Sequence, residues 1–371
     1  MTNALTPTSI AIDGLLAAAP LDLLVHNWAL VAIVSTVIVL VVVPYFVLRK
    51  YVRIALNIMR STKPPLARGP LDYVRLDGEP VQFNASDGLA LNGMLIRNES
   101  GAPPRGMIVF AHEFCSDMHS CARYCRPLLS AGYDVFTFDF RGHGQSECDP
   151  DYTPRQWVTD HDLNDLRGAI AYVRGWLRAQ NRSEDIGLFG ISRGACAALL
   201  IAAEDEGVRA IVVDGAFCTD CTIEYLMKRW AYIFARIRVL YENHHPLFWR
   251  ALRWMMIRRA SREFGCTFPS VRKALLRMPP RPILFIHGER DSYLPVEQSR
   301  LLYALAPQPK TLWVAPDARH NQAVVLHPER YAELTVGFFE RHLSAIGDAS
   351  DAAATRPDAA ARDEPLTPAG V

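Results

Sequence analysis

Short runs of apolar residues recur through the middle of the chain, and each is long enough for one buried strand. Six such runs lie at residues 107–111, 135–138, 186–189, 210–213, 283–286 and 311–314. Ahead of them, residues 81–83 and 89–97 flank Asp87-Gly88, a dipeptide typical of a hairpin turn. Helix-like stretches at 157–180 and 193–203 separate several runs. This order predicts an α/β fold with a mostly parallel central sheet and helices on both faces.

The apolar pattern changes near the N-terminus, where one run is far longer. Residues 23–48 carry no fixed charge, and residues 28–48 form a largely apolar stretch of 21 residues. Because soluble strands rarely exceed ten residues, this stretch favours a transmembrane helix at 27–48 over a buried strand. Residues 1–26 contain no Lys or Arg, whereas Arg49, Lys50, Arg53, Arg60, Lys63 and Arg68 follow the stretch. The positive-inside rule then predicts a single-pass membrane protein whose large C-terminal part is cytoplasmic.

The rest of the chain divides by composition. After the N-terminal tail (1–26), residues 49–75 are interpreted as a basic linker, residues 76–345 as the globular domain and residues 346–371 as a disordered tail. Residues 216–281 are too long for a simple crossover, and we call this segment the cap. The cap holds 13 Lys and Arg against four Asp and Glu, with several aromatic residues. It is predicted to be a helical insertion that contacts anionic lipid, or alternatively a solvated face over an ordinary apolar pocket.

Charge and cysteine content narrow the class of protein. The formal net charge of +1 argues against a dedicated nucleic-acid binder. Eight cysteines are scattered through the chain, and Cys218 and Cys221 form a C-x-x-C pair. That pair could begin a zinc site if His112, or His244 and His245, supplied further ligands. The alternative, which we favour, is a set of free thiols in a reducing compartment, with no metal and no cofactor.

One pentapeptide carries a specific chemical signal. Gly190-Ile-Ser192-Arg-Gly194 is a G-x-S-x-G sequence between a strand-like run and a helix-like run. In this context the serine sits on a sharp turn, and the small glycines avoid clashes there. The turn lifts the hydroxyl above the sheet edge, so Ser192 is predicted to be a nucleophile. The alternative is an ordinary glycine-rich turn between a strand and a helix.

A serine hydroxyl needs a base, and the base needs an orienting acid. His320 follows the last strand-like run and Asp291 follows the preceding one, so these two are the candidates. Asp214, at the end of another run, is the rival acid. The N–H groups of Arg193 and Phe114 are the predicted oxyanion hole, although residues 112–114 could be a simple exit from a strand.

These motifs together resemble the α/β-hydrolase superfamily. Beyond the serine turn, FDFRGHGQS (138–146) is similar to the family's D-x-R-G-x-G-x-S turn, and IHGERDSYLP (286–295) is similar to its acid loop. A long apolar stretch ahead of such a domain resembles the membrane-anchored bacterial hydrolases and their Bem46-like relatives. The resemblance implies hydrolysis of an ester, thioester, amide or lipid without a cofactor. His112-Glu113 replaces the family's usual His-Gly in the oxyanion loop.

The predicted function is a carboxylesterase-like or lipase-like serine hydrolase that works through an acyl-enzyme on an acyl-containing small molecule or lipid. A serine peptidase or an acyltransferase could use the same residues, and a catalytically silent membrane scaffold is the alternative from another class. Glu113 brings a negative charge near the oxyanion, so we expect it to pair with Arg193 or, failing that, both side chains to face solvent. Nothing in the sequence indicates the oligomeric state.

Overall fold

The computed structural model describes residues 27–61, 75–235 and 245–343. Contacts divide the chain into two compact units. One comprises residues 1–62 and 242–258, and the other comprises residues 63–241 and 259–371. The predicted tails at 1–26 and 346–371 lie outside the described residues. The second unit carries the sheet and all the predicted site residues.

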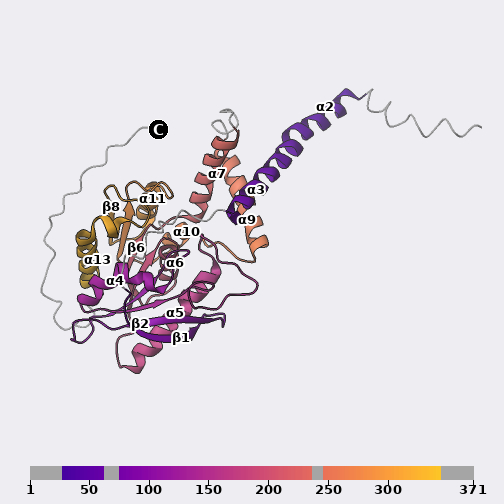
Figure 1. The fold of residues 1–371 in the computed structure, drawn as a ribbon. Helices are drawn as coiled ribbons and strands as arrows, with labels where there is room; N and C mark the ends of the chain where they lie inside the picture. Colours follow the sequence, from indigo (N-terminus) through magenta and orange to yellow (C-terminus); the bar gives the residue numbers. More distant parts are fainter. Residues whose placement is uncertain (1–26, 62–74, 236–244, 344–371) are drawn as a thin grey trace, which may run out of the picture. The chain divides into compact units, whose positions relative to one another are not determined.

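The sheet of the second unit has eight strands in the order β1-β2-β4-β3-β5-β6-β7-β8. Figure 1 labels β1 and β2 toward one edge of this sheet and β6 and β8 toward the other. β1 pairs with β2 and β2 with β4 in antiparallel fashion, whereas every other neighbouring pair is parallel. The strands are β1 Glu79–Asn84, β2 Ala90–Ile96, β3 Met107–Ala111, β4 Asp134–Phe138, β5 Ile186–Ile191, β6 Val208–Asp214, β7 Ile283–Gly288 and β8 Lys310–Ala315. The mostly parallel α/β sheet and the hairpin at Asp87-Gly88 are therefore confirmed.

Helices cover both faces of this sheet. On one face α4 packs against α13, and on the other α5, α6, α10 and α11 form a continuous row. Alternation along the strands separates the two cores: Phe110 and Phe189 join the core under α4 and α13, while Phe136 stacks near Tyr172 of α5. The helices of this unit are η2 Met118–Ser120, α4 Cys121–Ser130, α5 Asp160–Ala179, α6 Arg193–Ala202, α7 Thr219–Ala235, α10 Val271–Leu275, α11 Glu297–Leu305, α12 Ala323–Leu326 and α13 Pro328–His342.

The order of the strands fixes where a site can form. From β3 the chain moves to one side to form β4 and then crosses back to form β5 on the other side of β3. The connections therefore diverge between β3 and β5, and parallel α/β sheets bind ligands at the carboxyl ends of strands next to such a switch point. The loops after β3, β5, β7 and β8 are the ones that carry Phe114, Ser192, Asp291 and His320.

The N-terminal unit differs from the sequence prediction. In place of one span at 27–48, the chain forms α2 (Trp28–Val37), a π-helical stretch η1 (Ile38–Val42) and α3 (Val43–Ser61). Within the described ranges, no helix combines the length and the apolar character that a membrane crossing requires. The prediction of a transmembrane helix is therefore not supported, and the membrane and cytoplasmic placements stay predictions from the charge pattern.

The predicted boundaries of the linker and the cap also change. Residues 49–75 were interpreted as a basic linker, and residues 49–61 of this segment belong to α3, where no glycine or proline interrupts the helix. The segment called the cap lies between β6 and β7, and its described part contains α7, α9 (Pro246–Phe264) and α10. However, α9 crosses the division between the units, since residues 246–258 group with the N-terminal unit.

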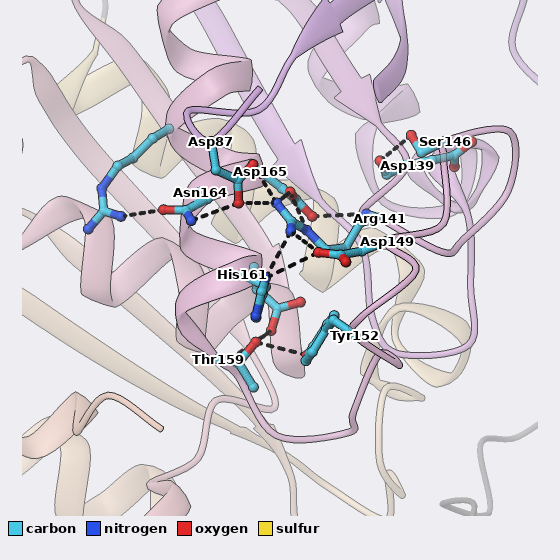
Figure 2. A network of polar contacts seen from close by, with 12 residues as sticks. Asp87, Asp139, Arg141, Ser146, Asp149, Tyr152, Thr159, His161, Asn164 and Asp165 are labelled. Carbon is cyan, nitrogen blue, oxygen red and sulfur yellow. Dashed lines mark hydrogen bonds and ion pairs between the residues drawn. The ribbon is translucent and has the colours of Figure 1, made fainter. Parts of the chain in front are cut away.

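A buried arginine ties the antiparallel edge of the sheet to α5 (Figure 2). The guanidinium of Arg141, in the turn after β4, contacts Asp165 of α5 at 2.7 Å, Asp87 of the hairpin turn at 2.8 Å and Asp149 at 3.0 Å. Burial works against the charged guanidinium, but Asp165 and Asp87 outweigh it and raise the pKa of Arg141. The D-x-R-G turn is thus a structural element, held by one cation among three carboxylates.

Arg141→Lys is expected to lower the free energy of unfolding by about 3 kcal/mol, because an ammonium cannot make the forked contacts and leaves buried carboxylates without a partner. Urea denaturation measures the loss. Arg330→Lys is the matched control, since Arg330 pairs with Glu333 on the surface and should change stability by less than about 0.5 kcal/mol. Equal midpoints for the two variants would contradict this role of Arg141.

Candidate active site

Ser192 occupies a strained turn between β5 and α6. Its φ of 52° and ψ of −110° lie outside the usual regions for a residue with a side chain. The flanking glycines are required by crowding. A Cβ on Gly190 would lie 2.5 Å from the carbonyl oxygen of Gly194, and a Cβ on Gly194 would lie 2.1 Å from that of Ala111. The turn therefore keeps its shape only with glycine at both positions.

Three of the predicted residues come together above the carboxyl edge of the sheet. The Nε2 atom of His320 lies 3.0 Å from the Oγ of Ser192, and its Nδ1 lies 2.6 Å from an Oδ of Asp291. These residues follow β8, β5 and β7 respectively. Three loops far apart in sequence thus form one chain of hydrogen bonds from a hydroxyl through an imidazole to a carboxylate.

The environment of Asp291 keeps it charged. Its other oxygen accepts the backbone N–H groups of Tyr293 and Leu294, at 2.9 and 2.7 Å. Burial favours the neutral acid, yet the contact with His320 outweighs it and lowers the pKa of Asp291. A carboxylate can only accept, so the Nδ1–H of His320 donates to Asp291. The Nε2 atom is then free to accept the proton of the Ser192 hydroxyl.

The rival acid, Asp214, faces another partner. One of its oxygens accepts the hydroxyl of Tyr331 at 3.0 Å, and the other has no hydrogen-bond partner among the described residues. Burial raises the pKa of Asp214 to about 7. Its backbone oxygen nevertheless matters, since it accepts the N–H of Ser192 at 2.7 Å and so pins the turn. Asp291, rather than Asp214, is the acid that contacts His320.

The two predicted oxyanion donors lie on the loops that flank Ser192. Arg193 is the first residue of α6, so its N–H has no acceptor within the helix and points out of the helix start. Phe114 lies in the loop after β3, two residues beyond His112. His112 shapes that loop: its Nδ1–H donates to the Glu113 carbonyl, and its Nε2 accepts the N–H of Phe140 at 3.1 Å. Burial lowers the pKa of His112, consistent with this neutral form.

The expected pair between Glu113 and Arg193 does not form, and the Arg193 side chain does not face solvent. The Arg193 guanidinium is completely buried and lies 3.2 Å from Asp162 of α5. It also donates to the Arg155 carbonyl and stacks over Phe114, 5.2 Å from the ring centroid. The prediction was wrong because α5 brings a carboxylate beneath the helix start. Arg193 therefore supports the loop after β3, which carries one predicted oxyanion donor, through the Phe114 ring.

Glu113 turns toward other groups. Burial raises the pKa of its carboxyl, although Arg123, Ser116 and His320 each act to lower this pKa. A raised pKa favours the neutral acid, and that reduces the negative charge next to the proposed oxyanion site. The replacement of the usual glycine is thus compatible with the site, although for a different reason from the one expected.

Two further histidines and one aspartate have structural contacts. His287 donates from Nε2 to the Leu294 carbonyl at 2.8 Å, and its Nδ1 accepts from Ser299, so it holds the loop that carries Asp291. His143 accepts from Arg193, and burial together with that cation lowers its pKa to about 3. Asp317 belongs to an exposed turn and pairs with Arg290, away from His320.

Among the described residues, no histidine joins Cys218 and Cys221 to complete the zinc site that this C-x-x-C pair could have begun. All eight cysteines are free. His112 has both ring nitrogens engaged in the oxyanion loop, and His244 lies outside the described residues. Cys218 and Cys221 do lie close together, with Asp220 beside them.

A pocket of about 360 Å³ opens beside the oxyanion loop. Phe114, Cys115 and Ser116 line it on one side, and His143 and Pro154 line it on the other. Phe114 is the residue that this pocket shares with the predicted oxyanion hole. A substrate group bound there would lie next to the N–H that is expected to hold the oxyanion.

Sequence reasoning missed three residues that position the site. Asp162 neutralises Arg193, and Tyr331 binds Asp214. Gly215, with φ of 66°, leaves room for the imidazole, since a Cβ there would lie 3.0 Å from Cε1 of His320. Only Gly215 had a signal in the sequence, as a glycine directly after a strand that ends in aspartate.

A serine on a strained turn after β5, with an aspartate after β7 and a histidine after β8, is the arrangement typical of the α/β-hydrolase class of protein. The model of the Alpha/beta hydrolase family matches residues 108–334, more than half of the chain. The chain belongs to the alpha/beta hydrolase family.

Two bacterial proteins and one solved structure are similar to this chain over most of its length. YfhR of Escherichia coli K12 is 28% identical over 265 residues, which cover 70% of this chain and 80% of YfhR. YqkD of Bacillus subtilis is 26% identical and covers 63% of this chain and 70% of its own length. Among solved structures, the esterase Pf2001 of Pyrococcus furiosus is 25% identical with a TM-score of 0.51, covering 76% of this chain and 99% of that protein. These matches give no support to the narrower resemblance to membrane-anchored or Bem46-like hydrolases.

The titration of Asp214 predicts a pH dependence of stability. An aspartate has a pKa near 4 when unfolded, so between about pH 4 and 7 the folded state holds a proton that the unfolded state has lost. This group therefore makes the free energy of unfolding fall as pH rises through that window. Asp214→Asn, which is always neutral, should lose up to about 4 kcal/mol less than wild type over the same range.

Urea denaturation at intervals from pH 4 to 8 measures both curves. Asp291→Asn is the matched control, because the pKa of Asp291 is lowered and its contribution has the opposite sign, being lost as pH falls through the folded pKa. Parallel curves for wild type and Asp214→Asn would show that the buried carboxyl does not titrate in this window.

Proposed function

We propose that this chain is a serine hydrolase that cleaves an acyl ester or thioester, in the manner of a carboxylesterase or lipase, through an acyl-enzyme. The observation that carries the proposal is the continuous contact from the Ser192 hydroxyl through His320 to Asp291, at 3.0 and 2.6 Å. Membership of the alpha/beta hydrolase family and the likeness to the Pyrococcus furiosus esterase support the same reaction class.

In the first step, Ser192 Oγ attacks the acyl carbon while its proton passes to His320 Nε2. Asp291 holds the ring in the required tautomer and stabilises the imidazolium that forms. The negative charge develops on the carbonyl oxygen, where the N–H groups of Phe114 and Arg193 would receive it. Each such donor contributes on the order of 3 kcal/mol in the transition state.

In the second half of the reaction, His320 gives its proton to the leaving alkoxide or thiolate, and the acyl group stays on Ser192. A water molecule then attacks the acyl-enzyme with His320 as base, and the same donors hold the second oxyanion. All of these steps use groups of this chain. An acyltransferase or a peptidase would follow the same first step and differ in the acceptor or the leaving group.

The acyl-containing substrate is proposed to be a small molecule or a lipid. Phe114 links the oxyanion loop to the adjoining pocket, so a substrate group that fills this pocket would be held next to the reacting carbonyl. Contact between the basic cap and anionic lipid stays a prediction from the charge of that segment.

The test is a panel of p-nitrophenyl esters of graded chain length, with a thioester, anilides and an alcohol acceptor alongside. Wild type is expected to hydrolyse esters or thioesters, and Ser192→Ala should lower kcat by at least about 10⁴-fold. Asp291→Asn should lower kcat by roughly 10² to 10⁴-fold with little change in KM, because the ring loses its orienting carboxylate.

Asp214→Asn is the matched control for Asp291→Asn, since both are carboxylates near the ring but only Asp291 contacts it. It should keep kcat within about threefold of wild type. Rapid anilide cleavage or acyl transfer in place of ester hydrolysis would redirect the proposal to a peptidase or a transferase. Turnover that survives in Ser192→Ala would refute it.

A further inference from the structure

Two thiols lie together at the first turn of α7, outside the proposed reaction. Cys218 directly precedes α7 and Cys221 is its third residue. Their sulfur atoms and a carboxylate oxygen of Asp220 all lie within 4.8 Å of one another. The N–H of Thr222 donates to the Cys218 carbonyl at 2.8 Å, which closes the turn that brings the thiols together.

The charges around the pair give the two thiols different roles. The Cys218 thiol donates its proton to Asp220 at 2.6 Å. Arg272 of α10 reaches across and places Nη1 3.7 Å from the Cys221 sulfur and 3.7 Å from the other oxygen of Asp220. The neighbouring Cys218 thiol and Arg272 lower the pKa of Cys221 against the effect of burial. Cys221 is the thiol prepared to react as a thiolate.

The two thiols also differ in their exposure to solvent. Cys218 is buried, whereas Cys221 is partly exposed. A small oxidant would therefore meet Cys221 first, and Cys218 lies behind it as the thiol that can attack next. The other close pair in the helices, Cys121 and Cys125 of α4, is fully buried, and burial raises the pKa of Cys121 to about 12. That pair lacks both access and thiolate character.

Arg272 also distinguishes thiol chemistry from metal binding. Cys218, Asp220 and Cys221 offer three ligand atoms of suitable type, but a structural zinc site takes four. The guanidinium beside Cys221 and Asp220 would repel a divalent cation brought to the same place. Because a fixed cation and a second sulfur lie next to Cys221, its thiolate is better suited to react with an oxidant than to bind a metal.

We propose that Cys218 and Cys221 are a peroxide-oxidisable dithiol that closes to an intrachain disulfide. The Cys221 thiolate attacks one oxygen of hydrogen peroxide, the S–O bond forms, the O–O bond breaks, and the departing hydroxide leaves as water after taking a proton from solvent. The Cys218 sulfur then attacks the sulfur of the Cys221 sulfenic acid. The S–S bond forms, the S–O bond breaks, and a second water leaves with the Cys218 proton. The dithiol loses two electrons to the peroxide.

The experiment treats the reduced full chain with hydrogen peroxide under nitrogen and follows intact mass and peptide masses. The chain with Cys115→Ser and Cys148→Ser is expected to lose 2 Da, and the loss should fall on the one tryptic peptide that contains both Cys218 and Cys221. The exposed Cys115 and Cys148 are replaced by serine in every variant so that their own oxidation does not obscure the change.

Single substitutions separate the two roles. Cys218→Ser should stop at a sulfenic acid on Cys221 that a 1,3-dione traps, and Cys221→Ser should remain reduced at Cys218. Arg272→Gln should slow disulfide formation about tenfold at pH 7, the effect of roughly one unit in the thiolate pKa, while Arg272→Lys keeps much of the rate. Cys125→Ser, the matched control in α4, should form the 218–221 disulfide at the wild-type rate.

Two results would overturn the proposal. One is a folded Cys115→Ser, Cys148→Ser chain, judged by circular dichroism, that keeps both thiols at peroxide doses that oxidise Cys115 in the unsubstituted chain. The other is tight one-to-one binding of Zn²⁺ to the reduced chain that protects both thiols and is lost in Cys221→Ser. Neither result depends on ester hydrolysis, so this proposal and the proposed function can fail separately.

Discussion

The strained conformation at Ser192 is the constraint on which the site depends. A residue with φ of 52° is costly unless its surroundings hold it. Gly190 and Gly194 allow the backbone of β3 and α6 to approach within distances that no side chain would permit, and the Asp214 carbonyl binds the serine N–H. The same turn directs the hydroxyl at His320 and exposes the first N–H of α6. The conformation of this one turn thus positions both the proposed nucleophile and one of the two proposed oxyanion donors.

The buried Arg193 connects the Ser192 turn to α5 and to the loop after β3. A guanidinium with no solvent exposure needs a carboxylate, and Asp162 of α5 supplies it. The contact joins α6, the helix that follows Ser192, to α5, and the same guanidinium stacks on Phe114 in the loop after β3. His143 is held neutral by burial and by the same cation, so it adds no competing charge. Arg141 is a second buried arginine that pairs with α5, through Asp165, and it lies at the antiparallel edge of the sheet (Figure 2).

The sheet and the three residues Ser192, Asp291 and His320 could be predicted from the sequence, because short apolar runs mark the strands and parallel strands end at one edge. Side-chain partners could not be predicted in the same way. Asp162 lies 31 positions before Arg193 in the sequence, where it looks like a residue on the solvent face of a helix. Only the packing of α5 against α6 shows that the two side chains meet. The predicted transmembrane helix finds no support in the described residues for a related reason. Hydropathy identifies an apolar stretch, but it does not report the π-helical break at Ile38–Val42 or the continuation of the helix through Ser61.

The most direct measurement of the central claim is covalent labelling of the full chain with a fluorophosphonate, followed by peptide mass mapping. A hydroxyl perched on the turn and deprotonated by His320 should carry the label at Ser192 alone. His320→Ala should slow the labelling by at least about 100-fold, and Ser192→Ala should abolish it. A label on another residue, or an unchanged rate in His320→Ala, would contradict the account.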